Sequence, residues 1–534
     1  MVRTTKASWA IAAALALGCS LDLPAPPNLI DDTSGGGQSS ATSVGGSSSG
    51  SESGGVEPDT VTVTHEFGPG ELDPFEEIEP CVSWTLNNEQ PLYVQAVTLS
   101  NLSSFHHSNW FVVPDSVYDG PDGYWDCGTR DFEEIAAAQA GTVIFAQSTQ
   151  SWVEEQRTAK GAVIKVPAHS RIVSDVHLLN LAPRKVETNL WMSLELVHPK
   201  DVDVVLTPMR LSYLDLTIPA QKKSRHSSDC SIRESYEGYL GGPEVHAYDL
   251  KLHYALPHYH SLGDYFDLRM LGGPQDGEML YQLEGFNAEA NGKTYDPPLD
   301  LSVGDGLSFT CGYDNFRSED VGWGIGDQEM CVMLLLVESE LLMDGSVISA
   351  SHFVGVEDDV TNYEGSCIVI GYPKNADQGP PTQAEIDGPL YVPPIPDGDV
   401  DLPPVPVCED SDPAAAPLPD ATLANIRATL FAPACSFSAC HGAGGAAGLD
   451  LTTPDLHTEL MNHQVTASTS SPLVAPGDPD GSWLFRIISQ CEPTDDAGNV
   501  LAHMPRNAPV LMDDALVATV RAWIEAGAPP DSTD

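Results

Sequence analysis

The strongest constraint on the fold is a succession of short apolar and β-branched runs between residues 60 and 375, each broken by Gly, Pro, Asn or Asp. Four examples are 92–97 (LYVQAV), 161–166 (GAVIKV), 202–206 (VDVVL) and 333–337 (MLLLV). Many short strands at regular spacing are typical of antiparallel β-sandwiches, and this stretch is long enough for two. We therefore predict a mainly β chain with two sandwich domains, at 61–215 and 216–375.

The last third of the chain has a different texture. Residues 376–418 are rich in proline and acidic residues, which predicts an extended, semi-rigid linker. Beyond the linker, apolar residues recur at helical spacing, as at Leu516, Val520 and Ile524. We expect residues 419–534 to form a separate, small all-α domain.

Composition excludes several classes of protein. The chain has 534 residues, of which 41% are hydrophobic, so it has material for packed cores and is not globally disordered. Its formal net charge is −53, with 24 Lys and Arg against 77 Asp and Glu. Nucleic-acid binding needs Lys and Arg to displace phosphate counterions, so we expect no nucleic-acid partner. The same charge opposes electrostatic docking on an anionic membrane.

The N-terminus predicts export. Arg3 and Lys6 precede an apolar stretch, residues 7–17, that is too short to span a bilayer. The stretch ends in Leu17-Gly18-Cys19, which resembles the lipobox of bacterial lipoproteins, although Ala16 stands where Leu is usual. The resemblance implies that 1–19 is a signal peptide and that Cys19 is lipidated. Plain secretion, with an unrelated Cys19, is the alternative.

The segment after Cys19 fits an anchored protein. Residues 20–60 are a Ser/Gly-rich stretch, which predicts a flexible tether. A lipid anchor followed by such a tether would hold a globular body clear of a membrane. We expect an extracytoplasmic protein that meets the membrane only through its anchor. The outer membrane, on its periplasmic or cell-surface face, is the favoured location.

The C-terminal part carries the most direct chemical signal. Residues 435–441 read CSFSACH, in which two thiols are followed at once by a histidine. This resembles the haem-attachment motif of class I cytochromes c, with four residues instead of two between the thiols. The resemblance implies thioether bonds from Cys435 and Cys440 to haem c, with His441 as proximal ligand and Met504 as distal ligand. His503 is the competing distal ligand, and a plain Cys435–Cys440 disulfide is the alternative to haem.

The β region carries a second constellation of histidines. They occur as His106-His107, as the isolated His177, and as the pair His258 and His260. Residues i and i+2 of a strand face the same way, so His258 and His260 can hold one ion together. A Glu-Met-Cys motif at 329–331 adds a thioether, and imidazoles with a thioether suit copper. Each piece alone is a weak signal.

In their order, these pieces resemble the copper type II, ascorbate-dependent monooxygenases, the family of the peptide-amidating and dopamine-hydroxylating enzymes. The resemblance covers roughly 60–370 and implies two antiparallel jelly rolls that hold one copper each. The implied electron-transfer copper is held by His106, His107 and His177. The implied catalytic copper, where O2 is activated, is held by His258, His260 and Met330.

Two departures bear on the substrate. The peptide-amidating members have an Arg two residues before the H-x-H motif and a Tyr four residues after the Met. These two side chains bind the carboxylate of the substrate. This chain has Leu256 and Leu334 there. Peptide amidation is therefore not favoured, and the apolar residues suggest a less charged substrate. His253 could substitute for a ligand if the register of its strand were shifted.

Cysteine arithmetic fits an oxidised protein. Of 11 cysteines, one is assigned to lipid and two to haem, which leaves an even number. The family resemblance implies the pairs Cys311–Cys331 and Cys230–Cys367. The remaining pairs, Cys81–Cys127 and Cys408–Cys491, follow by elimination.

Together these motifs predict a lipid-anchored, copper-dependent monooxygenase that binds two coppers and one haem c. It would hydroxylate a C–H bond of a small organic substrate with O2. A one-electron donor, either an ascorbate-like reductant or a redox protein, would supply electrons through the haem domain. Two alternatives stay open: a copper- and haem-binding electron-transfer or binding lipoprotein without hydroxylase activity, and a structural β-sandwich lipoprotein.

Overall fold

The computed structural model describes most of the chain after residue 59. The described residues are 60–531 without 69, 75, 102–104, 147–152, 181–184, 261, 285–291, 318, 325–327, 395–399, 401, 403–406, 437–440, 443–445, 466, 468 and 506–509. The predicted signal peptide, Cys19 and nearly all of the tether lie outside the described residues, as does Cys440.

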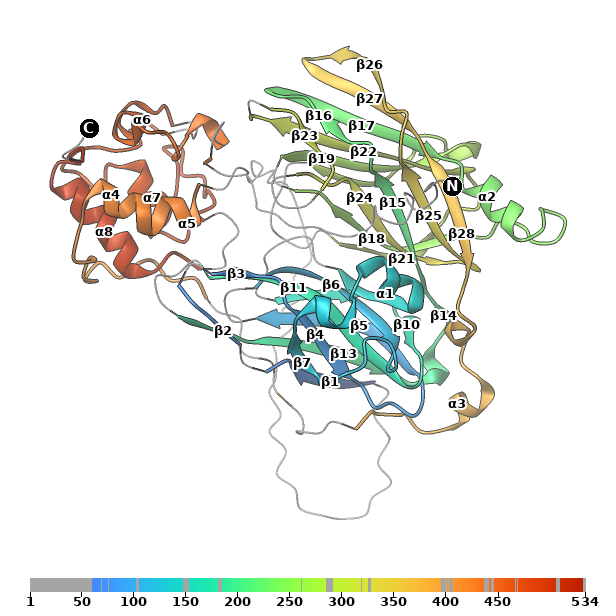
Figure 1. Ribbon diagram of the computed structural model, residues 1–534. Helices are drawn as coiled ribbons and strands as arrows, with labels where there is room; N and C mark the ends of the chain where they lie inside the picture. Colours follow the sequence, from blue (N-terminus) through green and yellow to red (C-terminus); the bar gives the residue numbers. More distant parts are fainter. Residues whose placement is uncertain are drawn as a thin grey trace, which may run out of the picture.

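The strands up to residue 205 form one pair of six-stranded sheets (Figure 1). One sheet contains β1 (Thr60–Glu66), β5 (Leu92–Asn101), β9 (Val153–Arg157), β10 (Ala162–Val166), β13 (Leu190–Val197) and β14 (Val204–Val205). The other contains β3 (Glu77–Ile78), β4 (Cys81–Thr85), β6 (Phe105–Pro114), β7 (Gly123–Trp125), β8 (Thr142–Ala146) and β11 (Ser170–Leu179). A small ribbon joins β2 (Gly70–Leu72) to β12 (Val186–Thr188), and helix α1 (Glu134–Ala140) precedes β8.

The strands from residue 207 to 373 form a second pair. One sheet contains β15 (Thr207–Tyr213), β18 (Lys251–His258), β21 (Lys293–Asp300), β24 (Val332–Glu338), β25 (Leu341–Val347) and β28 (Ile368–Pro373). The other contains β17 (Lys222–Cys230), β19 (Gly263–Leu271), β20 (Met279–Glu284), β22 (Gly306–Asn315), β26 (His352–Glu357) and β27 (Val360–Ser366). The ribbon β16 (Thr217–Ile218)–β23 (Val321–Gly322) and helix α2 (Ile232–Tyr239) complete it. Strand β15 precedes the boundary predicted at 215/216, so the second pair of sheets begins before that boundary.

Each pair of sheets packs face to face around its own apolar core, which confirms a mainly β chain built from β-sandwiches. The first core joins Val94 and Leu194 of one sheet to Trp110 and Ile172 of the other. Because successive side chains of a strand point to opposite faces of the sheet, these residues lie on the inner face. Most strand pairs are antiparallel, as expected; β10–β14, β15–β25 and β17–β27 are parallel. The finer prediction of jelly rolls stays a prediction.

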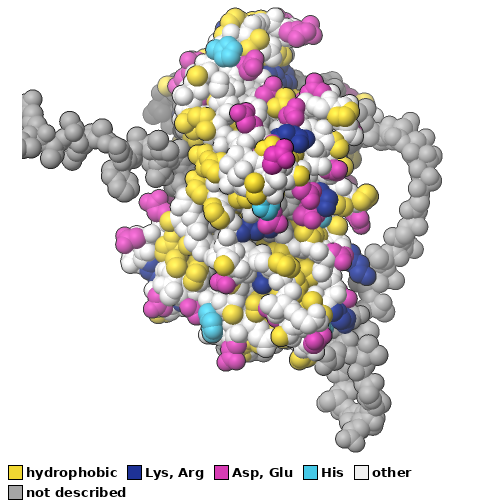
Figure 2. Space-filling view, turned by 90° about the vertical axis from the view of Figure 1, so that its right-hand side faces the viewer, with side chains coloured by type: hydrophobic (Ala, Val, Ile, Leu, Met, Phe, Trp, Pro, Cys, Tyr) yellow, Lys and Arg dark blue, Asp and Glu magenta, His cyan; other side chains and the backbone are white. Residues whose placement is uncertain are grey.

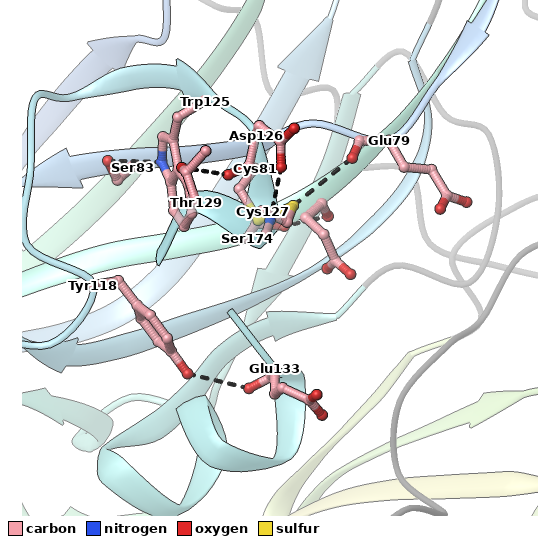
Figure 3. The surroundings of a disulfide bond; sticks show 12 residues. Glu79, Cys81, Ser83, Tyr118, Trp125, Asp126, Cys127, Thr129, Glu133 and Ser174 are labelled. Atoms are coloured by element: carbon pink, nitrogen blue, oxygen red, sulfur yellow. Dashed lines mark hydrogen bonds between the residues drawn. A yellow bond between two sulfur atoms is a disulfide. The ribbon is translucent and has the colours of Figure 1, made fainter. Parts of the chain in front are cut away.

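Four disulfides are present, with the pairing expected from the sequence: Cys81–Cys127, Cys230–Cys367, Cys311–Cys331 and Cys408–Cys491. Figure 3 shows the first of them, where β4 is bonded to the short helix that follows β7. Trp125 lies opposite Cys81 in the sheet, and its indole N–H donates to Ser83 Oγ at 3.2 Å. Disulfides of this number are typical of proteins that fold outside the cytoplasm.

The C-terminal residues form short helices around a third core. The helices are α4 (Leu423–Ile426), α5 (Ala432–Ala434), α6 (Leu456–Asn462), α7 (Trp483–Ser489) and α8 (Asp514–Glu525), with a π-helical turn at Arg427–Phe431. Trp523 of α8 is fully buried, and its indole N–H donates to Pro529 O at 2.9 Å. These helices are short, and a cytochrome c-like fold for this part stays a prediction. Within the described residues, no helix has the length and apolar character needed to cross a membrane.

The beginning of the linker is not free of the sandwiches. Helix α3 (Gln383–Asp387) starts with a capping box at Thr382 and lies beside the first sandwich. The buried Lys165 of β10 donates to Gly379 O at 3.0 Å, and the Tyr391 hydroxyl accepts from the Glu89 N–H at 2.9 Å. The Tyr391 ring also packs on the first core. We call residues 376–391 the strap, because they follow the second sandwich in sequence and lie on the first.

Replacing Tyr391 by Ala is expected to release the strap. The change removes both the hydrogen bond to Glu89 and the packing of a partly buried ring, a loss of about 2 kcal/mol. Hydrogen exchange of peptides within 376–391 should then accelerate, while exchange in β18 and β24 stays as in the wild type. Tyr372→Ala is the matched control, because that side chain is 42% exposed on β28. Equal protection of the strap in both variants would contradict this account.

The acidic character of the chain has no single location on the view of Figure 2. On that face, Asp and Glu side chains are spread among apolar and uncharged ones, with fewer Lys and Arg between them.

Candidate metal centres

The first set of predicted copper ligands lies on two neighbouring strands. His177 of β11 is the register partner of His107 of β6, and the register shifts directly after this pair. The antiparallel pairing therefore places these two positions opposite each other, with His106 next along β6. His177 is 5% exposed. The side chains of His106 and His107 are not among those that the structure describes, so the complete set is untested.

Acidic side chains lie near His177 of the first set. Asp175, two residues before His177, is the register partner of Asn109, whose amide donates to Glu134 Oε1 at 2.9 Å. Burial raises the pKa of Asp175 to about 6, and the charge of Glu79 acts in the same direction. Glu79 lies beside the Cys81–Cys127 disulfide in Figure 3, where its carbonyl is 3.7 Å from Cys127 Sγ. A cation held near His177 would have negative charge close by.

The second set is better defined. His258 is the last residue of β18, and His260 follows in the turn that leads to β19; their ring centroids are 5.3 Å apart. His260 is 2% exposed. The turn is tight, with the Gly263 N–H donating to His260 O at 2.9 Å. A Cβ at Gly263 would lie 1.9 Å from the Tyr259 ring, so this position requires glycine.

The direction of the His260 ring is fixed by its hydrogen bond. Its Nδ1 lies 2.8 Å from Gln328 O, and since a carbonyl can only accept, Nδ1 must carry the proton. Nε2 is then the lone-pair nitrogen, and it is buried without a hydrogen-bond partner. Burial lowers the pKa of His260 to about 4 and also lowers that of His258, so both rings are neutral at pH 7. Neutral imidazole with an oriented, unshared nitrogen is the form that binds a metal.

Met330 is brought to the same turn by strand pairing. Val332 of β24 is the register partner of His258, and Met330 lies two residues before Val332. The buried Tyr313 hydroxyl donates to Met330 O at 2.6 Å, and Cys331 is bonded to Cys311. Met330 itself is 7% exposed. The structure therefore joins the segments that carry His258, His260 and Met330, although these are about 70 residues apart in the sequence.

Glu329 lies at the centre of this region, although the sequence indicated no role for it. Its side chain is fully buried, and its two oxygens accept from the backbone N–H groups of His260 (2.8 Å) and Leu262 (2.7 Å). Burial raises the pKa of Glu329 to about 8, against the lowering effect of these donors. The only signal in the sequence was its place in the Glu-Met-Cys motif.

The residues present fit copper at the second set by their chemistry. Two neutral imidazoles and a thioether are soft ligands, and an unpartnered buried Nε2 is costly unless something binds it. Among the described side chains, no group of three or more His, Cys, Asp and Glu gathers as a metal site. A His–His–Met set contributes only two residues of those types, because methionine is not among them.

Leu256 and Leu334, which stand where the peptide-amidating members have Arg and Tyr, are register partners on β18 and β24. Leu256 is buried in a cluster with Tyr254 and with Ala146 of β8, and Leu334 packs against that cluster. The two leucines thus help to join the two sandwiches. This packing explains their apolar character without reference to a substrate.

His253 is not a substitute ligand. It lies where the register of β18 shifts between Leu252 and Tyr254, five residues before His258. Its Nε2 is 3.9 Å from Glu338, near the opposite end of β24 from Met330. The irregularity in the register of β18 falls at His253 itself, and His258 keeps its pairing with Val332.

In the C-terminal part, two of the predicted haem-binding residues, Cys435 and Met504, pack against the third core. The His441 N–H donates to Cys435 O at 2.9 Å, which brings His441 next to Cys435. Burial raises the pKa of the free Cys435 thiol to about 12 and lowers the pKa values of His441 and His503. Nδ1 of each histidine is buried without a partner. His441 therefore stays the predicted proximal ligand, and His503 stays the competitor of Met504 for the distal position.

Comparisons with known proteins do not place the chain in a family. No protein-family model matches it, and no curated protein does. Among solved structures it is similar to N-glycanase F (PNGase F), with 8% identity and a TM-score of 0.25 over 53% of this chain and 96% of that chain. It is also similar to a structure of infectious bursal disease virus, with 5% identity and a TM-score of 0.13 over 53% and 41% of the two chains. At such TM-scores neither likeness carries an argument.

Proposed function

We propose that this protein is an extracytoplasmic copper-dependent monooxygenase, anchored through Cys19, which hydroxylates a C–H bond of a small organic substrate. In this proposal the two sandwiches are jelly rolls and the C-terminal part is a cytochrome c-like domain. The single observation that supports it most is the orientation of the His260 ring. Its protonated Nδ1 faces Gln328 O, and its Nε2 is buried without a hydrogen-bond partner. The centroid of this ring is 5.3 Å from that of His258.

The two sets of predicted copper ligands have different roles in this proposal. His258, His260 and Met330 would hold the copper at which O2 reacts, and His106, His107 and His177 would hold a second copper. When bound, these ions would supply O2 activation and one-electron transfer. The chain's own contribution is to keep both imidazoles neutral by burial and to fix the His260 tautomer through Gln328 O.

The C-terminal part would serve as the electron donor. Cys435 and Cys440 would bind haem c covalently, with His441 as one axial ligand and Met504 or His503 as the other. Haem c supplies one electron at a time, and monooxygenation consumes two. Joining donor and acceptor in one chain raises the effective concentration of the donor to roughly the millimolar range.

The test is the metal content of the purified secreted protein after loading with Cu(II), together with a pyridine haemochrome spectrum. Two coppers and one covalent haem per chain are expected, followed by reductant-dependent O2 consumption with a responsive substrate. Metals without O2 consumption across a broad substrate screen would favour an electron-transfer protein. A protein that binds no copper would refute the proposal.

A further inference from the structure

Glu329 joins two segments of the second centre with one side chain. It precedes Met330 in the chain, and it holds the turn that carries His260 through the amides of His260 and Leu262. Its own backbone is fixed as well, because its N–H donates to Gly322 O at 2.9 Å and its carbonyl accepts from the Gly324 N–H at 3.1 Å. Any movement of Met330 relative to His260 must therefore strain these contacts.

A carboxyl group is costly to bury at a position whose role is to hold a turn. Burying a carboxylate costs several kcal/mol before its hydrogen bonds and any cation are counted. A neutral amide could accept one of the two N–H groups, but it would turn an N–H of its own toward the other. Both oxygens of Glu329 accept at 2.7–2.8 Å, an arrangement that a carboxyl group can offer and a side-chain amide cannot.

We infer that Glu329 is a positioning residue. It fixes the His260 turn against Met330, so that His260 Nε2 and the Met330 thioether can bind the same metal ion. The inference rests on the proposed function for the metal, but the hydrogen-bonded arrangement itself does not. Partners of this kind, one shell beyond the ligands, typically contribute 10- to 100-fold in metal affinity.

The test compares Glu329→Gln with wild type and with Glu338→Gln. Glu338 is a matched control because it is the glutamate that ends β24, the strand that Glu329 precedes, is 38% exposed and is paired with Lys251. In the metal-free protein, hydrogen exchange of peptides covering 258–263 should accelerate in Glu329→Gln only. In copper titrations with a competing chelator, affinity at the second centre should fall by about 10- to 100-fold, with an altered EPR spectrum. The affinity of the first centre should not change.

A second variant guards against a trivial loss of folding. Glu329→Asp keeps the carboxyl group and is one methylene shorter, so it should reach only one amide and give a smaller loss of affinity. Unchanged exchange at 258–263, or copper affinity and EPR equal to wild type in both Glu329 variants, would overturn the positioning role. Failure of the wild type to bind copper would overturn the proposed function instead, and the exchange measurement would still decide whether Glu329 fixes the turn.

Discussion

Replacing His258 by Ala should leave one copper per chain and reduce substrate-dependent O2 consumption by more than about 100-fold, beyond the loss typical of residues that act through a ligand. His258 stands at the end of β18, and its ring centroid is 5.3 Å from that of His260. The measurements are copper content by mass spectrometry and O2 uptake with a constant reductant.

His246→Ala is the control for this experiment, because His246 is an exposed histidine just upstream of β18. It should keep two coppers and full O2 uptake. Two coppers in His258→Ala would show that the second centre uses other ligands. Loss of copper with unchanged O2 uptake would separate the metal from the reaction.

Removing the Cys230–Cys367 disulfide should cost about 5 kcal/mol of unfolding free energy in the second sandwich, on the chain-entropy estimate for a loop of 137 residues. Cys311–Cys331 closes only 20 residues, which gives about 3 kcal/mol on the same estimate. The Cys→Ala pairs, measured by calorimetry of the metal-free protein, should follow that order.

The two disulfides should show the opposite order in copper binding. Cys331 follows Met330 directly, so opening Cys311–Cys331 frees the segment that carries a ligand. We expect it to weaken copper at the second centre, while opening Cys230–Cys367 does so only as far as the sandwich unfolds. The same loss of copper from both variants under native conditions would contradict this distinction.

The sheet content was predictable because it depends on local patterns. The disulfides were predictable because the family resemblance implied two pairs and elimination left the other two. Runs such as 92–97 alternate or cluster apolar residues in the way strands require, and they fall within β5 as expected. The strap was not predictable. Its composition indicates an extended linker, and what fixes it is long-range contact of Lys165 with Gly379 and of Tyr391 with Glu89.

The residues of the candidate site could be singled out from the sequence, but the contacts that support them could not. His258 and His260 stood out because two histidines at i and i+2 are an unusual feature of a strand end. Glu329 did not, because a glutamate in a sequence reads as a surface residue unless its burial is known. Only the fold shows that its oxygens meet the amides of residues 69 and 67 positions earlier in the chain.

The strap also limits how far the C-terminal helices can travel. It is held on the first sandwich up to Tyr391, and Cys408 is bonded to Cys491 beside α7. The chain between Tyr391 and Cys408 reaches at most about 60 Å when fully extended. The C-terminal part is thus tethered to the first sandwich, which carries His177, although the second sandwich is nearer to it in the sequence. Encounters between these two bodies are intramolecular, so their rate should be independent of protein concentration.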